Sequence, residues 1–189
     1  MLKRRRTQKT DYRKRLAMLK SRKVRLVVRK SLSNIHAQLI EYEQSGDRTV
    51  AEEVSKNLKK YGWKGHCGNI SAAYLTGMLV AAKGLKKDVK EAVLDLGLQT
   101  STKQNVAYAV VRGANDAGMS IPMDNKIAPG TERISGKHVA DFAAMLKSGN
   151  PEKYKKQFSG CLKSGLDPED LPKHFEEVKN KIKHELLKG

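Results

Sequence analysis

The chain has 189 residues, 39% of them hydrophobic, which is enough for one core with extensions and too few for two full domains. Its formal net charge is +18, and residues 1–30 hold 14 basic side chains against the single acid Asp11, a concentration that favours a polyanionic partner. The longest apolar run falls well short of the roughly 20 residues that cross a bilayer, so we expect no membrane contact.

The N-terminal segment is predicted to be a basic arm. Residues 1–10 have no apolar periodicity and are expected to be extended, whereas Tyr12, Leu16 and Leu19 recur at helical spacing and predict a short basic amphipathic helix. Eight of the eleven arginines lie in residues 1–30. Guanidinium groups suit bidentate phosphate contacts and stacking on bases, so RNA or DNA is favoured over the alternative of a merely solvated tail.

Two strands and a hairpin are predicted next. Every second residue is apolar over residues 24–29 and again over residues 35–40, and the residues between them are mostly polar, which is the period of a strand with one apolar face. The linker over residues 30–33 can close a hairpin, and a third strand is expected near Thr49–Ser55. If the registers agree, the outward face of this hairpin gathers Arg25, Arg29, His36 and Gln38.

A glycine-rich, lysine-rich loop over residues 59–69 leads into an apolar helix predicted from Ile70 to about Ala82, with Asn69 as its N-cap. Small residues recur in this helix every four positions, which suits close packing on the sheet. The run AVLDLG, residues 92–97, is typical of a strand that is buried on both faces. At the turn after it, Ser101 or Thr102 is expected to cap the next helix.

Two further helices are expected, one near residues 104–117 that Gly118 closes, and one whose Val139, Phe142 and Leu146 share a face. Strands alternating with helices after a hairpin indicate an α/β fold, a single domain with a mixed β-sheet packed by helices.

The last forty residues differ in composition from the rest of the chain. They are lysine-rich, contain several Gly and Pro, and end in a helix with Phe175, Val178 and Ile182 on one face. This pattern predicts an extension that packs on the core or on a neighbour. We therefore divide the chain into a basic N-terminal arm with a short helix (residues 1–22), an α/β RNA-binding core (23–148) and a helical C-terminal extension (149–189).

Sequence motifs for catalysis or metal binding are weak. The glycines between Gly62 and Gly68 fit neither common nucleotide-binding loop. Cys67 and Cys161 are far apart without a CxxC pair and are expected to be free thiols, and the five histidines form no ligand pattern, so no metal or cofactor is expected. What remains are basic segments with interleaved aromatic residues, the groups that contact phosphates and bases of folded RNA.

Four ordered segments carry a resemblance to a known family. They are TDYRKRLAMLKSRKVRLVVRKSLSNIHAQLI, KYGWKGHCGNISAAYLTGMLVAAKG, AVLDLGLQTSTKQNVAYAVVRGANDAGMSIP and RISGKHVADFA. Together they span nearly the whole chain, which resembles the archaeal and eukaryotic branch of the "L-eighteen" family of large-subunit ribosomal proteins. The chain length favours an archaeal source.

The resemblance implies a non-catalytic protein of the cytoplasmic ribosome. It would bind 5S ribosomal RNA (rRNA) and attach it to 23S rRNA and neighbouring large-subunit proteins in the central protuberance, with no small-molecule substrate. The RNA-facing elements carried over by position are the arm through Arg22, the hairpin segment Arg29–Ser31 with Asn34, and the loop Lys59–Lys64. Leu32 and Cys67 depart from the family pattern, which puts these two positions in doubt as RNA contacts.

Taken together, the residue patterns and the resemblance predict one set of RNA-binding side chains: Arg4, Arg5, Arg6, Lys9, Arg13, Arg15, Lys20, Arg22, Lys23, Arg25, Arg29, Lys30, Ser31, Asn34, His36, Gln38, Lys59, Lys60, Tyr61, Trp63 and Lys64. Two alternatives stay open at this point. One is a small nucleotide-binding enzyme built on residues 92–103, and the other is a basic DNA-binding protein, since charge alone does not distinguish nucleic acids.

Overall fold

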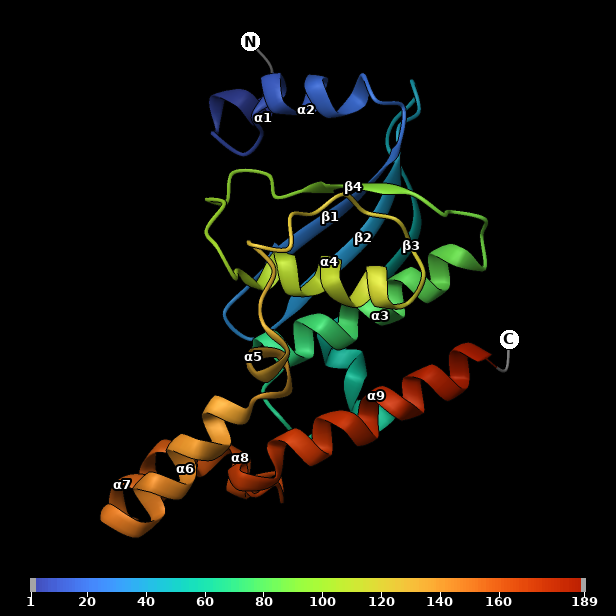
Figure 1. Ribbon diagram of the computed structural model, residues 1–189. Coiled ribbons are helices and arrows are strands. Elements are labelled where there is room, and N and C mark those ends of the chain that lie inside the picture. The colour runs from blue at the N-terminus through green and yellow to red at the C-terminus, as the bar shows by residue number, and fades with distance from the viewer. Residues whose placement is uncertain (1–2, 188–189) are drawn as a thin grey trace.

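The computed structural model describes residues 3–187, so the predictions for residues 1–2 of the arm and 188–189 of the extension lie outside it. Figure 1 shows a four-stranded sheet with helices α3 and α4 on one face and the short N-terminal helices α1 and α2 on the other side. Helix α9 runs along the far side of α3, and helices α5 to α8 form a lobe at one end. The predicted α/β fold is confirmed.

The sheet has the order β3-β2-β1-β4. Strand β1 pairs antiparallel with β2 and parallel with β4, so the sheet is mixed, as predicted. The strands are β1 (Val24–Lys30), β2 (Ile35–Glu41), β3 (Arg48–Val54) and β4 (Ala92–Asp95).

The helices alternate with these strands and continue beyond them to the C-terminus. They are α1 (Lys3–Arg6), α2 (Tyr12–Leu19), the 3-10 helix η1 (Ser55–Tyr61), α3 (Ile70–Leu85), α4 (Val106–Asp116), α5 (Thr131–Ser135), α6 (Lys137–Gly149), α7 (Pro151–Gln157), α8 (Ser159–Lys163), the 3-10 helix η2 (Pro168–Asp170) and α9 (Leu171–Leu187). None of the helices described is both long and apolar enough to cross a membrane.

The β1–β2 hairpin has the predicted register. Arg29 lies opposite His36, and Val27 lies opposite Gln38. Because side chains alternate across a strand, Arg25, Arg29, His36 and Gln38 share the outward face. The other face carries buried apolar residues that pack against α3 and α4, among them Leu26, Val28, Ile35, Ala37 and Leu39.

Helix α3 is buried on all sides because it lies between two apolar clusters. One cluster joins it to the sheet and α4; the other joins it to η1 and α9 through residues that include Trp63, Tyr74 and Phe175. The extension therefore packs on the core, and its predicted face of Phe175, Val178 and Ile182 is buried. Asn69 caps α3 as predicted, its side-chain oxygen accepting from the amide of Ala72 at 2.7 Å.

Of the small residues of α3, Ala73 and Ala81 lie in the cluster shared with the sheet, as predicted, whereas Gly77 has a different role. A Cβ atom at Gly77 would overlap the carbonyl oxygen of Val110 in α4, and one at Gly113 would overlap the carbonyl oxygen of Tyr74 in α3. Gly77 thus permits close packing of two helices and does not face the sheet.

Three local predictions were wrong. Residues 3–6 form a helical turn instead of an extended segment, with the Thr7 hydroxyl donating to the Lys3 carbonyl at 3.1 Å. Strand β4 is an edge strand, so Val93 and Leu94 are half-buried and not fully enclosed. The N-cap residue of α4 is Asn105, while the Ser101 hydroxyl bonds to the hydroxyl of Tyr108.

Candidate nucleic-acid interface

The arm presents its cations to solvent. The Asp11 carboxylate accepts from the amides of Arg13 and Lys14 at 3.0 and 3.2 Å and so begins α2. Neither α1 nor α2 contains a buried residue. Most of the predicted arm contacts form no ion pair within residues 3–187. These residues are Arg4, Arg5, Arg6, Lys9, Arg13, Lys20 and Arg22. These cations are available to a polyanion.

The exceptions in this region are Arg15 and Lys23, whose charges are paired. Lys23 lies 2.5 Å from Glu91, and both side chains are about half-exposed. Nη2 of Arg15 lies 2.8 Å from Oδ1 of Asp47, which fastens α2 to the turn before β3. The Lys23–Glu91 pair is exposed and therefore weak, so a phosphate can compete for Lys23, whereas the Arg15–Asp47 pair is more buried.

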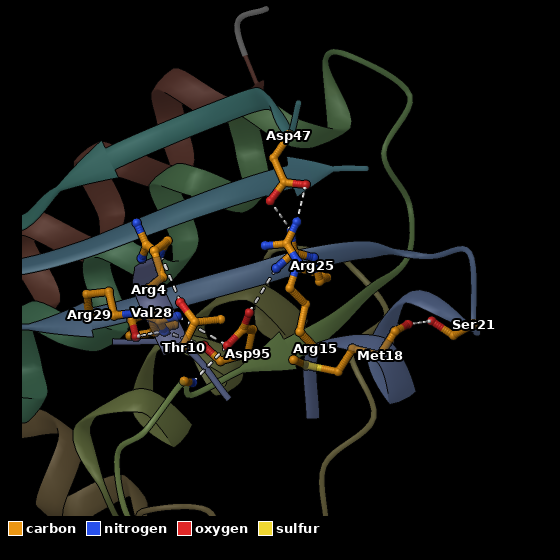
Figure 2. Close-up of polar contacts among 11 residues, drawn as sticks. Arg4, Thr10, Arg15, Met18, Ser21, Arg25, Val28, Arg29, Asp47 and Asp95 are labelled. Atoms are coloured by element: carbon orange, nitrogen blue, oxygen red, sulfur yellow. Dashed lines mark hydrogen bonds and ion pairs between the residues drawn. The ribbon is translucent and has the colours of Figure 1, made fainter. Parts of the chain in front are cut away.

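A buried network of charges lies beneath the arm (Figure 2). Arg25 is 3% exposed, and its guanidinium donates to Oδ2 of Asp47 at 2.7 Å and to Oδ2 of Asp95 at 3.0 Å. The predicted RNA contact Arg25 is therefore not accessible to RNA in the structure, because its side chain is buried and its two terminal nitrogens donate to carboxylates. Arg25 instead joins the β2–β3 turn to β4.

The same network fixes Arg29. Its guanidinium donates to the carbonyl oxygens of Val28 and Asp95, each at 2.8 Å, and to Oδ1 of Asp95 at 3.2 Å. The side chain remains 45% exposed. A guanidinium has five N–H donors, and the residues described engage three of them, so two remain for a ligand. Asp95 thus holds Arg29 in one orientation on the outward face of the hairpin.

The hairpin tip is rigid and polar. Ser31 Oγ donates to the carbonyl of Asn34 at 2.9 Å and accepts from its amide at 3.0 Å. The predicted contact Ser31 therefore has a structural role, while Lys30 is exposed and Asn34 half-buried. Leu32 at the tip is 96% exposed.

The remaining members of the outward face differ in availability. The side-chain amide of Gln38 donates to Oε2 of Glu52 at 3.1 Å, so it is engaged within the sheet. His36 is exposed.

The segment Lys59–Lys64, which covers the end of η1 and the loop after it, is only partly available. Lys59, Lys60 and Lys64 are exposed. Tyr61 is half-buried, and burial together with Glu185 raises the pKa of its phenol to about 12. Trp63 is 2% exposed, so its ring, which was predicted to contact RNA, is not accessible to a base in the structure.

The indole of Trp63 is already stacked. Its ring centroid lies 5.3 Å from that of His174 in α9, at an interplanar angle of 20°. Nε2 of His174 accepts from the amide of Lys64 at 3.1 Å, which requires a neutral imidazole at that atom. Burial lowers the pKa of His174, and the nearby Lys64 and Lys181 lower it further against an opposing effect of Glu177. The neutral ring thereby holds the loop against the C-terminal extension.

This arrangement predicts a loss of stability in mild acid. Because the pKa of His174 is lowered from 6.5 in the folded chain, the unfolded chain binds the proton more readily, and the free energy of unfolding falls as pH drops below 6.5. Burial lowers the pKa of His138 as well, so it contributes in the same direction. Urea denaturation at a series of pH values should show a weaker decline in His174→Gln and almost none between pH ~5 and ~6.5 in the double variant with His138→Gln. A double variant that retains the full decline would contradict this cause.

Two acids that sequence reasoning missed organise the interface. Asp47 follows a turn in the sequence. Asp95 interrupts the apolar run AVLDLG, and a charged residue in such a run indicates that an oppositely charged side chain lies nearby. The patterns did not connect either acid with Arg25, since the partners are 22 and 70 residues apart. No group of three His, Cys, Asp or Glu side chains within residues 3–187 is arranged to hold a metal ion. Cys67 and Cys161 are free thiols, as predicted, and burial raises the pKa of both.

The chain is similar to known proteins over most of its length. A family model described as ribosomal large subunit proteins 60S L5 and 50S L18 matches residues 1–91, which hold the arm, the hairpin and α3. The large ribosomal subunit protein uL18 of Methanococcus maripaludis is 55% identical over 179 residues, which cover 95% of this chain and 92% of that protein.

Proposed function

The chain belongs to the L5e/L18 family of large-subunit ribosomal proteins, and from this premise we propose that it binds 5S rRNA and attaches it to 23S rRNA in the central protuberance. Membership makes it a structural component of the large subunit of the cytoplasmic ribosome and not an enzyme, which removes the nucleotide-enzyme alternative. The relative from Methanococcus maripaludis is archaeal, in line with the source expected from chain length.

The observation that carries the proposal is the pairing of a free cationic arm with a rigid hairpin. The arm cations are exposed on helices without buried residues, so they meet phosphates of any sequence. Arg29 is held by Asp95 and backbone carbonyls, and so presents its donors in a fixed geometry to one RNA shape. In this proposal residues 1–22 supply affinity, the core supplies specificity, and the extension after residue 148 supports the loop.

The division of labour predicts opposite effects for two variants. Arg29→Ala with Asn34→Ala should reduce the preference for 5S rRNA over an unrelated structured RNA by about tenfold, because the hairpin loses the fixed guanidinium of Arg29 and the side chain at a hydrogen-bonded turn position. Deletion of residues 1–10 should weaken binding to both RNAs alike. Filter binding measures each affinity, and circular dichroism first establishes that both variants fold. If the double variant keeps full discrimination while the deletion abolishes it, the roles are reversed.

A further inference from the structure

A cleft of about 950 Å³ opens between the hairpin tip, the loop after η1 and the C-terminal extension. Asn34 lines it from the hairpin, Lys59 from η1, and Gly160 with Cys161 from α8. The cleft therefore joins the predicted RNA-facing elements to a part of the chain for which no RNA contact was expected.

The lining of this cleft is cationic. Lys56, Lys59 and Lys64 contribute to it, and no Asp or Glu is among its lining residues. By contrast, a cavity on α9 contains Glu177 and Glu185, and a cavity beside β1 has acids among its lining residues too. Lys56 and Lys59 have no ion-pair partner within residues 3–187. A ligand of this cleft should carry negative charge.

One wall carries an oriented aromatic ring. His66 is exposed, and its Nδ1 accepts from the amide of Gly68 at 3.0 Å, which fixes the imidazole plane. Trp63 Nε1 donates to the carbonyl of His66 at 3.4 Å and holds the backbone beneath it. Gly160 has no side chain, and a Cβ atom placed there would meet no atom of the described residues within 4 Å, so a flat group can approach on that side. Unpaired bases of RNA stack on histidine rings in this way.

The two walls are fastened together before any ligand binds. Ser164 Oγ, at the end of α8, donates to the carbonyl of Lys64 at 2.9 Å. The ammonium group of Lys64 also lies 3.5 Å from the carbonyl of Gly165. A cleft of fixed shape loses little conformational entropy on binding, which favours a specific ligand over diffuse attraction.

We propose that this cleft binds an unpaired nucleotide of rRNA, with its phosphate at Lys56, Lys59 and Lys64 and its base against His66. The C-terminal extension then forms part of the RNA-binding surface. The proposal deepens the proposed function and rests on it. An acidic peptide would satisfy the lysines, but it would leave the oriented ring and the open side at Gly160 unused.

The test uses two glycines at which an added Cβ would meet no atom within 4 Å, Gly160 in the cleft and Gly149 at the end of α6 outside it. Gly160→Trp should fill the cleft and weaken binding to 5S or 23S rRNA at least about tenfold, the scale of one lost stacking contact. Gly149→Trp is the matched control and should bind both RNAs like the unaltered chain. His66→Ala should weaken binding to the same RNA as Gly160→Trp.

A second measurement does not depend on variants. Cys161 lines the cleft and is partly exposed, so its rate of alkylation by iodoacetamide reports occupancy. The rate should fall when the unaltered chain binds the rRNA that enters the cleft, and comparing 5S with 23S rRNA identifies the source. Unchanged affinity of Gly160→Trp together with unchanged alkylation in both complexes would overturn the proposal. Protection of Cys161 only in the assembled large subunit would also overturn it, since a protein would then be the occupant.

The two proposals fail separately. If the unaltered chain does not bind 5S rRNA, the proposed function is refuted, whereas protection of Cys161 by 23S rRNA would still support the cleft. If 5S rRNA binds, neither RNA protects Cys161 and Gly160→Trp keeps its affinity, only the cleft proposal is refuted.

Discussion

Replacement of Asp95 by alanine is expected to lower the free energy of unfolding by about 3–5 kcal/mol, because it leaves a buried guanidinium without one of its two carboxylate partners. Arg25 is 3% exposed, and its Nε atom already has no hydrogen-bond partner among residues 3–187. Asp95 also accepts from the amide of Gly97 at 2.8 Å and from Arg29, so the loss extends to the hairpin face. Urea denaturation followed by circular dichroism measures the change.

The neighbouring acid Glu91 provides the control for Asp95. Its ion pair with Lys23 is solvent-exposed, so Glu91→Ala should change stability little. Replacing Arg25 and Asp95 together by leucine should recover most of the loss, since apolar side chains can substitute for a buried pair. Equal effects of Asp95→Ala and Glu91→Ala would show that burial of Arg25 is not what makes Asp95 important.

Neutralising the arm should have the largest effect on RNA binding. Replacing five unpaired cations by glutamine, at Arg4, Arg5, Arg6, Lys9 and Arg13, should lower affinity for 5S rRNA on the order of 10³-fold near physiological salt. The log–log salt slope should become shallower by about four, because each phosphate contact contributes about 0.7–0.9. Stability should change little, since neither α1 nor α2 contains a buried residue.

Filter binding over a series of potassium chloride concentrations gives both the affinity and the slope. A slope that changes by less than about one would mean that the arm cations do not reach phosphates. The same variant tested against an unrelated RNA should lose a similar factor, because phosphate contacts carry no sequence information.

The strands and helices could be predicted where apolar residues recur with the period of a strand or lie in a long apolar run. Alternation in residues 24–29 and 35–40 fixed the hairpin face, and the apolar run from Ile70 predicted a buried helix. The edge position of β4 could not be predicted, because a short apolar run does not show how many neighbours a strand has. The prediction that Gly77 faces the sheet was wrong for a similar reason. A four-residue spacing of small residues identifies a helix face that allows close packing, but it does not show which element packs on that face.

The sequence patterns placed the candidate interface on particular elements, but they did not show which of its side chains are paired or covered within the chain. An arginine on the outward face of a strand gives the same sequence pattern whether it binds RNA or pairs with an aspartate. The partners of Arg25 are distant in the sequence, so its pairing could not be predicted. Trp63 stands among glycines and lysines like an exposed loop residue, but the extension supplies His174 to cover it. The cleft was missed because its walls lie about a hundred residues apart, as the contact between Ser164 and Lys64 shows.

The most direct test of the account compares the affinity of the unaltered chain for three partners at near-physiological salt: 5S rRNA, an unrelated structured RNA of the same length, and duplex DNA of that length. If the hairpin recognises the shape of 5S rRNA, this RNA should bind tighter than the other two by on the order of 10³-fold, the usual margin of specific over non-specific binding to nucleic acid. Equal affinity for all three would contradict it, because the chain would then act as a general polyanion binder without a shape-specific hairpin.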